Sequence, residues 1–358
     1  MKQMNVALVV TLAFTIQFIT GCKNNNNPAD SSNPIPALTK GVYVLNEGNF
    51  GRSNASLTFY SLDSNQAFQD VFGSVNKRPL GDTGNDIVIY GTKGFIVVNQ
   101  SHKIEVISTE DNTSLGTIQL PNKSPRCIAV VNAAKAYVTN WGDNSVSIFN
   151  PTTFAVEKDS IAVGNAPEGI IVVNGKVYVC NSGWGSDSTL TVIDAATDKI
   201  IKHIIVGKGP ETLGVDASGD IFVQCSGYSD WSNPANDSPG SISVIDAAAD
   251  TVKSTIAMPL DIFGHPGEIA VSKNGYAMIK VKNGVAKIDT KSNLFVSNSF
   301  ITAHSAYSIA VDDVTNYIYV SDAKSYTEDG EVKIYNSAGS EIAKFAAGII
   351  PGDFAFKR

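Results

Sequence analysis

The chain repeats one sequence unit about every 40 residues, and this period is the feature that most restricts its fold. One copy places Tyr-Val-Thr-Asn at 137–140, an alternating apolar run at 145–150 and Ala-Pro-Glu-Gly-Ile at 166–170. The next copy places Tyr-Val-Cys-Asn at 178–181 and Gly-Pro-Glu at 209–211. Short β-rich runs that recur with such a period are typical of a β-propeller, in which every repeat forms one blade.

Seven blades are predicted from the strand that carries the Tyr-Val-x-Asn pattern. The last residue of this strand recurs at Asn46, Asn99, Asn140, Asn181, Cys225, Val281 and Asp322. Each unit contains an apolar strand, this strand, an alternating strand and a last strand that runs into Gly-x-x-Pro, which gives four strands to a blade. The sequence therefore predicts an all-β fold, a seven-bladed propeller of four-stranded blades over residues 40–358.

The two ends of the repeat region predict how the ring closes. The region begins with a second strand at 42–46 that has no first strand before it, and it ends with a first strand at 351–356 that has nothing after it. We expect the C-terminal strand to pair into blade one, with Phe354, Ala355 and Phe356 beside Tyr43 and Val44. Such pairing would leave no open sheet edge between the first and last blades.

The first 21 residues have the pattern of a lipoprotein signal peptide. Lys2 supplies a positive charge, and 6–19 is an apolar stretch too short to span a bilayer well. Ile-Thr-Gly-Cys at 19–22 resembles a lipobox, so Cys22 is the expected site of lipid attachment. An ordinary secretory signal, in which Cys22 has no role, is the alternative. Residues 22–39, rich in Asn, Ser and Pro, are predicted to be a flexible linker between the lipid and the propeller.

Charge and cysteine content exclude some classes of function. The formal net charge is −7 and the chain has no Lys/Arg-rich run, which argues against binding to nucleic acid. Besides Cys22, the chain has Cys127, Cys180 and Cys225, which lie in or beside apolar runs and are predicted to be small core residues. A Cys180–Cys225 disulfide is the alternative for two of them. No spacing is typical of a metal-binding cysteine cluster, and no cofactor is required by any motif.

Aromatic residues predict a binding face. In a propeller blade, the loop between strands two and three opens on the same side as the loop to the next blade, and Trp141, Trp184 and Trp231 all fall in loops of the first kind. Tyr228 and Tyr326 lie in equivalent loops. Exposed aromatic side chains gathered on one face are unfavourable unless they bind something, so we expect a binding surface there. Local packing of these side chains as loop anchors is the alternative.

Polar residues are expected at the rim of the central channel on this same face. The inter-blade loops carry Asp82, Asn85, Arg126, Glu168, Glu211, His265, Glu268 and His304. Three of the acidic residues, Glu168, Glu211 and Glu268, occupy nearly equivalent positions in the repeat. A turn carboxylate that accepts hydrogen bonds from neighbouring backbone is one interpretation of these three, and a ligand contact is the other.

The sequence also resembles known families. The Tyr-Val-Thr-Asn strand at 137–140 is similar to the YVTN-type, YncE-like propeller repeat. The segments 45–51 and 80–87, with Asn46, Asp82 and Asn85, resemble the cell-surface propeller lipoproteins of Bacteroidota that bind cobalamin (the BtuG type). This resemblance implies a non-enzymatic outer-membrane lipoprotein, at the cell surface or the periplasmic face, that binds a corrinoid such as cobalamin and passes it to a TonB-dependent transporter. The expected ligand contacts are then Trp141, Trp184, Trp231, Tyr228, Asn46, Asp82, Asn85 and Arg126.

Two further classes of function remain open. A propeller lyase or lactonase would place a metal or an acid/base pair at the channel mouth, where His265, Glu268 and His304 come from consecutive loops. A surface module that docks another protein, without a small-molecule ligand, is the other alternative. Fold alone distinguishes none of these, because propellers carry many activities.

Overall fold

The structure is a computed structural model that describes residues 39–358. The predicted signal peptide, Cys22 and all of the predicted linker except Thr39 lie outside the described residues. In the described part of the chain, no helix is long and apolar enough to cross a membrane.

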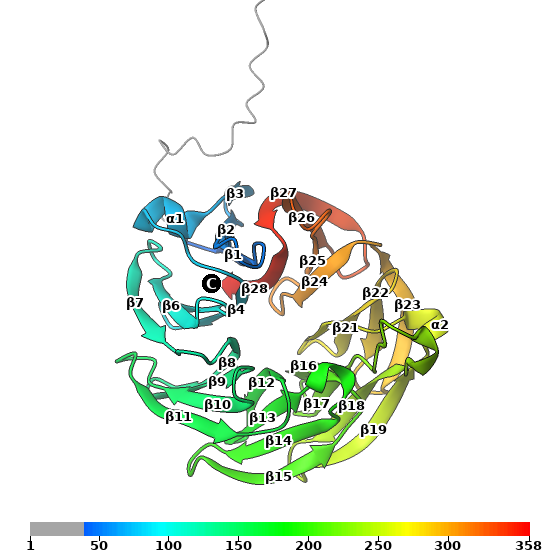
Figure 1. The fold of residues 1–358 in the computed structure, drawn as a ribbon. Coiled ribbons are helices and arrows are strands. Elements are labelled where there is room, and N and C mark those ends of the chain that lie inside the picture. The colour runs from blue at the N-terminus through cyan, green and yellow to red at the C-terminus, as the bar shows by residue number, and fades with distance from the viewer. Residues whose placement is uncertain (1–38) are drawn as a thin grey trace, which may run out of the picture. The chain divides into compact units, whose positions relative to one another are not determined.

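The described residues form seven antiparallel sheets of four strands each, which confirms the predicted propeller of seven blades (Figure 1). The first three blades contain, in spatial order, β28 (Pro351–Lys357), β1 (Gly41–Asn46), β2 (Ser56–Ser61) and β3 (Gln66–Phe68); β4 (Gly84–Tyr90), β5 (Lys93–Val98), β6 (Lys103–Ser108) and β7 (Ser114–Gln119); and β8 (Pro125–Asn132), β9 (Lys135–Asn140), β10 (Ser145–Phe149) and β11 (Val156–Ala162). The fourth and fifth contain β12 (Pro167–Val173), β13 (Lys176–Asn181), β14 (Thr189–Asp194) and β15 (Lys199–Ile205); and β16 (Pro210–Val215), β17 (Ile221–Cys225), β18 (Gly240–Asp246) and β19 (Thr251–Met258).

The last two blades contain β20 (Ile269–Val271), β21 (Tyr276–Val281), β22 (Gly284–Asp289) and β23 (Leu294–Thr302); and β24 (Ala306–Val311), β25 (Ile318–Asp322), β26 (Asp329–Tyr335) and β27 (Glu341–Ile349). Short helices in the connections are α1 (Val71–Asn76), α2 (Leu260–Phe263) and two 3₁₀ turns, Gly183–Gly185 and Pro234–Asn236. The second strand ends at the predicted position in six blades, and Asn99 follows the end of β5 by one residue.

Strand β28 closes the ring. It pairs antiparallel with β1, and the register places Phe356 opposite Val42, Ala355 opposite Tyr43 and Phe354 opposite Val44. Figure 1 shows the red C-terminal strand beside the blue N-terminal one. Val42 and Val44 are fully buried, and they pack in one cluster with Phe354 and side chains of the seventh blade. The predicted closure is confirmed.

The tyrosine of the Tyr-Val-x-Asn strand links neighbouring blades. Its hydroxyl donates to a residue in the turn between the third and fourth strands of the next blade, in the pairs Tyr43–Asn112, Tyr137–Asp198 and Tyr178–Asp250. The three acceptor residues have positive φ angles of 62°, 58° and 54°, a conformation that Asn and Asp tolerate better than most side chains. The repeat therefore encodes both the turn and its partner.

The asparagine of the same strand bonds the third strand of its own blade and the backbone near the end of the preceding blade. The amide nitrogen of Asn181 donates to the hydroxyls of Thr189 and Thr191 on β14, and its oxygen accepts from the backbone of Gly164. Asn46 is fully buried in the equivalent position and bonds Ser56, Thr58 and Gly348 N–H. These contacts account for the recurrence of asparagine in the repeat.

The cysteines of the propeller are free thiols. Cys180 and Cys225 are fully buried in one apolar cluster, and Cys127 lies at the wall of the central cavity. The structure therefore has no Cys180–Cys225 disulfide, and burial raises the pKa of all three thiols. The interpretation of Cys180 and Cys225 as small core residues holds.

Removal of residues 351–358 tests the closure. We expect the truncated protein to lose at least about 5 kcal/mol of stability, because β1 loses its partner strand and the core around Val44 loses Phe354. The measurement is chemical denaturation monitored by circular dichroism. Phe50→Ala is the control, since Phe50 is 76% exposed and its loss should change stability by about 0.5 kcal/mol or less. An unchanged unfolding midpoint in the truncated protein would contradict the closure.

Candidate functional site

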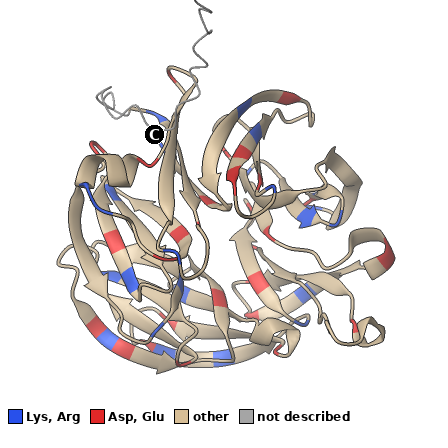
Figure 2. Cartoon of the chain, turned by 45° about the horizontal axis from the view of Figure 1, so that its top comes forward, with Lys and Arg blue, Asp and Glu red and all other residues tan. Residues whose placement is uncertain are grey.

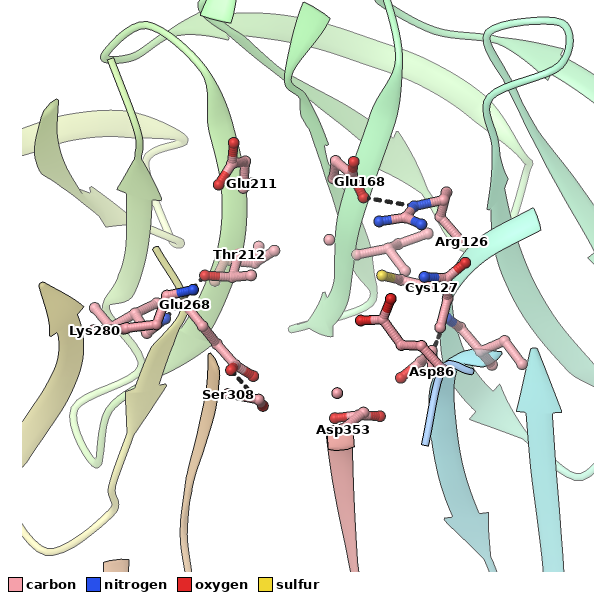
Figure 3. A pocket seen from close by; sticks show the side chains of 18 of the residues that line it. Asp86, Arg126, Cys127, Glu168, Glu211, Thr212, Glu268, Lys280, Ser308 and Asp353 are labelled. Atoms are coloured by element: carbon pink, nitrogen blue, oxygen red, sulfur yellow. Dashed lines mark hydrogen bonds and ion pairs between the residues drawn. The ribbon is translucent and has the colours of Figure 1, made fainter. Parts of the chain in front are cut away.

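The innermost strands of the blades surround a cavity of about 500 Å³ on the propeller axis. Strands β4, β8, β12, β16, β20, β24 and β28 contact one another in succession around the ring, and the first residues of each strand line the cavity. Figure 3 shows labelled side chains from opposite sides of the axis around this space. Each blade thus contributes equivalent positions to one site.

Two successive positions of the inner strand supply the polar lining. The first, which follows a proline in five blades, Gly84 in the second and Ala306 in the seventh, is occupied by Asn85, Arg126, Glu168, Glu211, Gly267, Tyr307 and Gly352. The second is occupied by Asp86, Cys127, Gly169, Thr212, Glu268, Ser308 and Asp353. The third position is apolar in every blade, so the cavity is polar at its mouth and apolar at its base.

Two glycines at the first position admit side chains from other strands. A Cβ atom on Gly352 would lie 2.6 Å from Oε1 of Glu47, and one on Gly267 would lie 2.1 Å from Cε of Lys280. Glu47 directly follows β1 and Lys280 lies on β21, so neither belongs to an inner strand. The missing side chains therefore let a carboxylate and an ammonium group reach the cavity.

Side chains at the second position link adjacent blades. Asp353 accepts a hydrogen bond from the Ile87 N–H at 2.7 Å, and Asp86 accepts one from the Ile128 N–H at 2.6 Å. Glu268 accepts in the same way from the Ile309 N–H at 2.8 Å. The interpretation of Glu268 as a turn carboxylate bonded to neighbouring backbone is therefore correct. These carboxyl groups therefore join adjacent blades and also line the cavity.

Carboxyl groups outnumber basic groups in the cavity. Figure 2 shows acidic and basic residues interspersed over the described blades, whereas the cavity lining has six carboxyl groups and only Arg126 and Lys280 as cations. Burial raises the pKa of Glu47, Glu168, Glu211 and Glu268. The negative charge in the cavity is therefore reduced in two ways: the raised pKa values favour protonated carboxyl groups, and Arg126 forms an ion pair with Glu168.

Asp86 and Asp353 form a coupled carboxyl pair. Burial raises the pKa of Asp86 to about 6, and burial together with the negative charge of Asp86 raises that of Asp353 further. A hydrogen bond from Asp353 to Asp86 offsets part of the shift of Asp86. The pair therefore holds one proton between its carboxyl groups around neutral pH, as two adjacent carboxylates do when both cannot ionise.

Arg126 connects the cavity with the aromatic residues. Its Nε donates to Glu168 at 2.9 Å, and its guanidinium lies 4.0 Å from the ring centroid of Trp141. The Trp141 ring meets Trp184 edge-on at a centroid distance of 5.6 Å. The negative charge of Glu168 outweighs the effect of burial and raises the pKa of Arg126, so the cation persists at this place. Trp141 is half-buried, so it supports Arg126 as a packing partner.

Aromatic side chains stand in the loops between the second and third strands of four blades. Trp184 is 64% exposed and Trp231 is 95% exposed, while Tyr228 is half-buried. Tyr326 packs edge-on against Tyr307, a cavity residue whose hydroxyl donates to Glu47 at 2.7 Å. We call the loop residues Trp141, Trp184, Tyr228, Trp231 and Tyr326 the aromatic rim.

The other predicted contacts are placed differently. Asn85 and Arg126 line the cavity, whereas Asn46 is fully buried and its amide is already bonded on both sides. Asp82 lies in the loop before β4, where its carboxylate accepts from Gly51 N–H and Thr83 Oγ1. The structure thus places Asn85 and Arg126 at the cavity, with Trp141 against Arg126, and it gives Asn46 and Asp82 local structural bonds.

The three residues of the lyase or lactonase alternative are not brought together. Glu268 lines the cavity, but His265 bonds Ser226 and Asp237 in the blade-five loop, and His304 is exposed. Among residues 39–358, no group of three or more His, Cys, Asp or Glu side chains is arranged to hold a metal ion.

Sequence reasoning missed Glu47, Asp86, Lys280, Tyr307 and Asp353 as cavity residues. Alignment of the inner strands by the apolar residue that follows the two polar positions would have identified Asp86, Tyr307 and Asp353, because they occupy repeat positions equivalent to those of Glu168 or Glu268. Glu47 and Lys280 have no such indication, since their entry depends on glycines in other strands.

Comparisons with known proteins agree on the fold. Residues 40–348 match the family described as Domain of unknown function (DUF5074). No curated protein matches the sequence. A quinonprotein alcohol dehydrogenase-like protein of Bacteroides thetaiotaomicron is similar in structure, with a TM-score of 0.68, 15% identity and coverage of 90% of this chain and 79% of that one.

Two other solved structures are similar. Hydrazine synthase of Kuenenia stuttgartiensis has a TM-score of 0.61 at 18% identity, with coverage of 73% of this chain and 85% of that one. A streptogramin B lyase has a TM-score of 0.57 at 12% identity, with coverage of 85% and 87%. At such identities these likenesses show the propeller fold alone.

The carboxyl pair predicts how stability depends on pH. Because the folded state raises both pKa values, it binds more protons than the unfolded chain, so this contribution to stability is present at low pH and is lost as pH rises through about 6 and beyond. Asp353→Asn keeps an oxygen for the Ile87 N–H and offers Asp86 a neutral donor. We expect the wild type to lose about 1–2 kcal/mol more than this variant between pH 5 and pH 8, measured by urea unfolding. Glu328→Gln, at an exposed carboxylate, is the control; equal losses in wild type and Asp353→Asn would contradict the pairing.

Proposed function

The chain belongs to the DUF5074 family, and we propose that it is a non-enzymatic binding protein whose ligand covers the mouth of the central cavity. The observation that carries this proposal is the exposure of Trp184 and Trp231, at 64% and 95%, on the side where the cavity opens. A tryptophan left in water forgoes a large apolar burial, so loops that hold two such rings beside a cavity favour a role in binding.

The lining of the cavity indicates which chemistry the ligand offers. Carboxyl groups such as Glu211 accept hydrogen bonds, whereas Arg126 and Lys280 donate them. A ligand edged with primary amides satisfies both kinds of partner, because an amide presents N–H donors beside a carbonyl acceptor. A broad apolar surface on the same ligand would stack on the rim. Ligand pockets commonly combine these features.

A corrinoid has this combination of a broad, partly apolar ring and amide edges. The resemblance of segments 45–51 and 80–87 to the cobalamin-binding surface propellers supports the same ligand class. We therefore propose cobalamin or a related corrinoid as the ligand and a TonB-dependent transporter as the partner that receives it. Asn46 and Asp82 take part by shaping the loops around the cavity, since their side chains bond within the protein.

Membrane attachment through Cys22 is the second part of the proposal. A lipidated cysteine followed by a linker that ends near Thr39 would hold the propeller at the outer membrane, close to a transporter. This placement raises the local concentration of the propeller at the site where a bound corrinoid would be transferred.

Substitution of the exposed tryptophans tests the binding site. We expect Trp184→Ala and Trp231→Ala each to weaken binding of cyanocobalamin by about 2 kcal/mol or more, because aromatic side chains that stack on a ligand carry much of the binding energy. Stability should change by about 0.5 kcal/mol or less, since both rings are exposed. Isothermal titration calorimetry and urea unfolding measure the two quantities.

The control is Leu294→Ala, which removes a 65% exposed apolar side chain from the outer strand β23. It should change neither affinity nor stability appreciably. Absence of cyanocobalamin and cobinamide binding at micromolar protein would overturn the corrinoid proposal. Destabilisation by several kcal/mol in both tryptophan variants would instead identify the rings as structural anchors.

Substitution of Cys22 tests the anchor. We expect Cys22→Ser to move the protein from the membrane fraction to the soluble fraction of cells, because the lipid can no longer be attached. The released protein should bind cyanocobalamin as the wild type does, since the binding site lies in the propeller. Fractionation followed by immunoblotting measures the shift. Retention of the variant on membranes would show that another element anchors the chain.

A further inference from the structure

Glu211 has weaker protein partners than the other carboxyl groups of the cavity. It lies at the first lining position of β16, and its Oε2 accepts a hydrogen bond from Nε2 of Gln224 at 3.5 Å. That nitrogen also donates to the Pro266 carbonyl, at 2.8 Å. The nearby Ser226 hydroxyl likewise donates to a backbone carbonyl, that of Gly209 at 3.2 Å. Because an ionised carboxylate offers about four acceptor sites, Glu211 keeps acceptor capacity that the protein leaves unused.

Glu168 occupies the equivalent position on β12 but forms an ion pair. Nε of Arg126 donates to it at 2.9 Å, and Figure 3 shows this bond as a dashed line, whereas no dashed line reaches Glu211. The other cation of the cavity, Lys280, donates to the Tyr307 carbonyl at 2.9 Å. Among residues 39–358, no lysine or arginine forms an ion pair with Glu211. Its charge is therefore open to a ligand.

An exposed tryptophan lies between Arg126 and Glu211. The guanidinium lies 4.0 Å from the ring centroid of Trp141, and that ring meets Trp184 edge-on at 5.6 Å. A Cβ atom on Gly209 would lie 3.1 Å from Cα of the residue after Trp184, so the loop of Trp184 touches the segment that leads into β16. Trp184 is 64% exposed. A ligand that stacks on this ring can thus reach a donor, Arg126, and an acceptor, Glu211.

We propose that Glu211 is a specificity-determining residue, which accepts an N–H from a primary amide of the ligand and excludes ligands that carry a carboxylate in its place. An amide supplies the donor that the free lone pairs of Glu211 lack. A carboxylate has no proton to donate, and it would bring a second negative charge against the first. This inference rests on the proposed function, because it names the chemical group that the same cavity selects.

The role requires the ionised form of Glu211. Burial raises the pKa of this carboxyl group, whereas hydrogen bonds from Ser226 and Gln224 and the positive charges of Lys280 and Arg126 lower it. The binding measurements are therefore made at pH 8, which favours the carboxylate.

The test compares cyanocobalamin with its three monocarboxylic acids, in each of which one propionamide is hydrolysed. We expect at least one acid to bind the wild-type, full-length protein about tenfold more weakly than cyanocobalamin, the size of one lost charged hydrogen bond. In Glu211→Gln the same ratio should fall to about threefold or less, because the glutamine amide both accepts from an amide and donates to a carboxylate. Isothermal titration calorimetry measures both ratios.

The matched control is Glu341→Gln, which removes an exposed carboxylate from the outer strand β27. It lowers the net charge by the same amount and should leave the wild-type ratio unchanged. Acid-to-amide ratios that are the same in the wild type and in Glu211→Gln for all three acids would overturn the role of Glu211. So would a ratio that falls equally in Glu341→Gln.

A smaller pair of probes decides the case in which no corrinoid binds. Indole-3-acetamide and indole-3-acetate differ in one group, an amide against a carboxylate. Their binding is followed by fluorine NMR of the protein labelled with 5-fluorotryptophan, in which Trp184→Phe assigns one of three resonances. We expect the amide to shift the Trp184 resonance at about tenfold lower concentration than the acid, and this preference to disappear in Glu211→Gln.

The outcomes separate this inference from the proposed ligand. Absence of corrinoid binding, with a preference for the indole amide that depends on Glu211, would overturn the corrinoid and support selection for amides. Tight binding of cyanocobalamin and all three acids alike would support the corrinoid and overturn selection by Glu211. Absence of corrinoid binding, with equal or no response to the two indole probes, would overturn both.

Discussion

The pairing of β28 with β1 is the interaction on which the other contacts of the propeller depend. A blade can bury its two faces only against its neighbours, so the series of blades is stable only when the first and last are joined. The chain meets this requirement by placing one strand of blade one at its C-terminus. Asp353, on that strand, then bonds the Ile87 backbone of the second blade.

The same inner strands that join the ring also form the candidate site. Asp86, Glu268 and Asp353 hold a neighbouring backbone N–H with one oxygen and line the cavity as well. Substitutions there will therefore change stability together with any binding. The aromatic rim is different, because Trp184 and Trp231 project from loops and contribute little to blade packing. Binding and folding can be separated experimentally at the rim but not at these three carboxyl groups.

Local pattern predicted the repeated elements because each follows from a rule that acts within one blade. The Tyr-Val-x-Asn strand was identified by period alone, and the loop position of the tryptophans followed from blade topology. Pattern failed where a side chain has a local bond that the sequence does not reveal. Asn46 was expected to contact ligand because of its motif, yet its amide ties β1 to β2. His265 was grouped with Glu268 by its place in the chain, yet it faces the blade-five loop.

The sequence by itself determined the number of blades and the strand that closes the ring, because period and strand order fix both. Only the tertiary structure decided which charges meet on the axis. Glu47 enters the cavity because Gly352, at the other end of the propeller sequence, leaves room for it, and Lys280 enters because Gly267, just before the neighbouring strand β20, has no side chain. Asp86 and Asp353 lie 267 residues apart in the chain and share a proton because ring closure brings the first two blades together. The contact between Asp86 and Asp353 depends on how the two strands are placed in the closed ring, and a local sequence pattern does not contain this information.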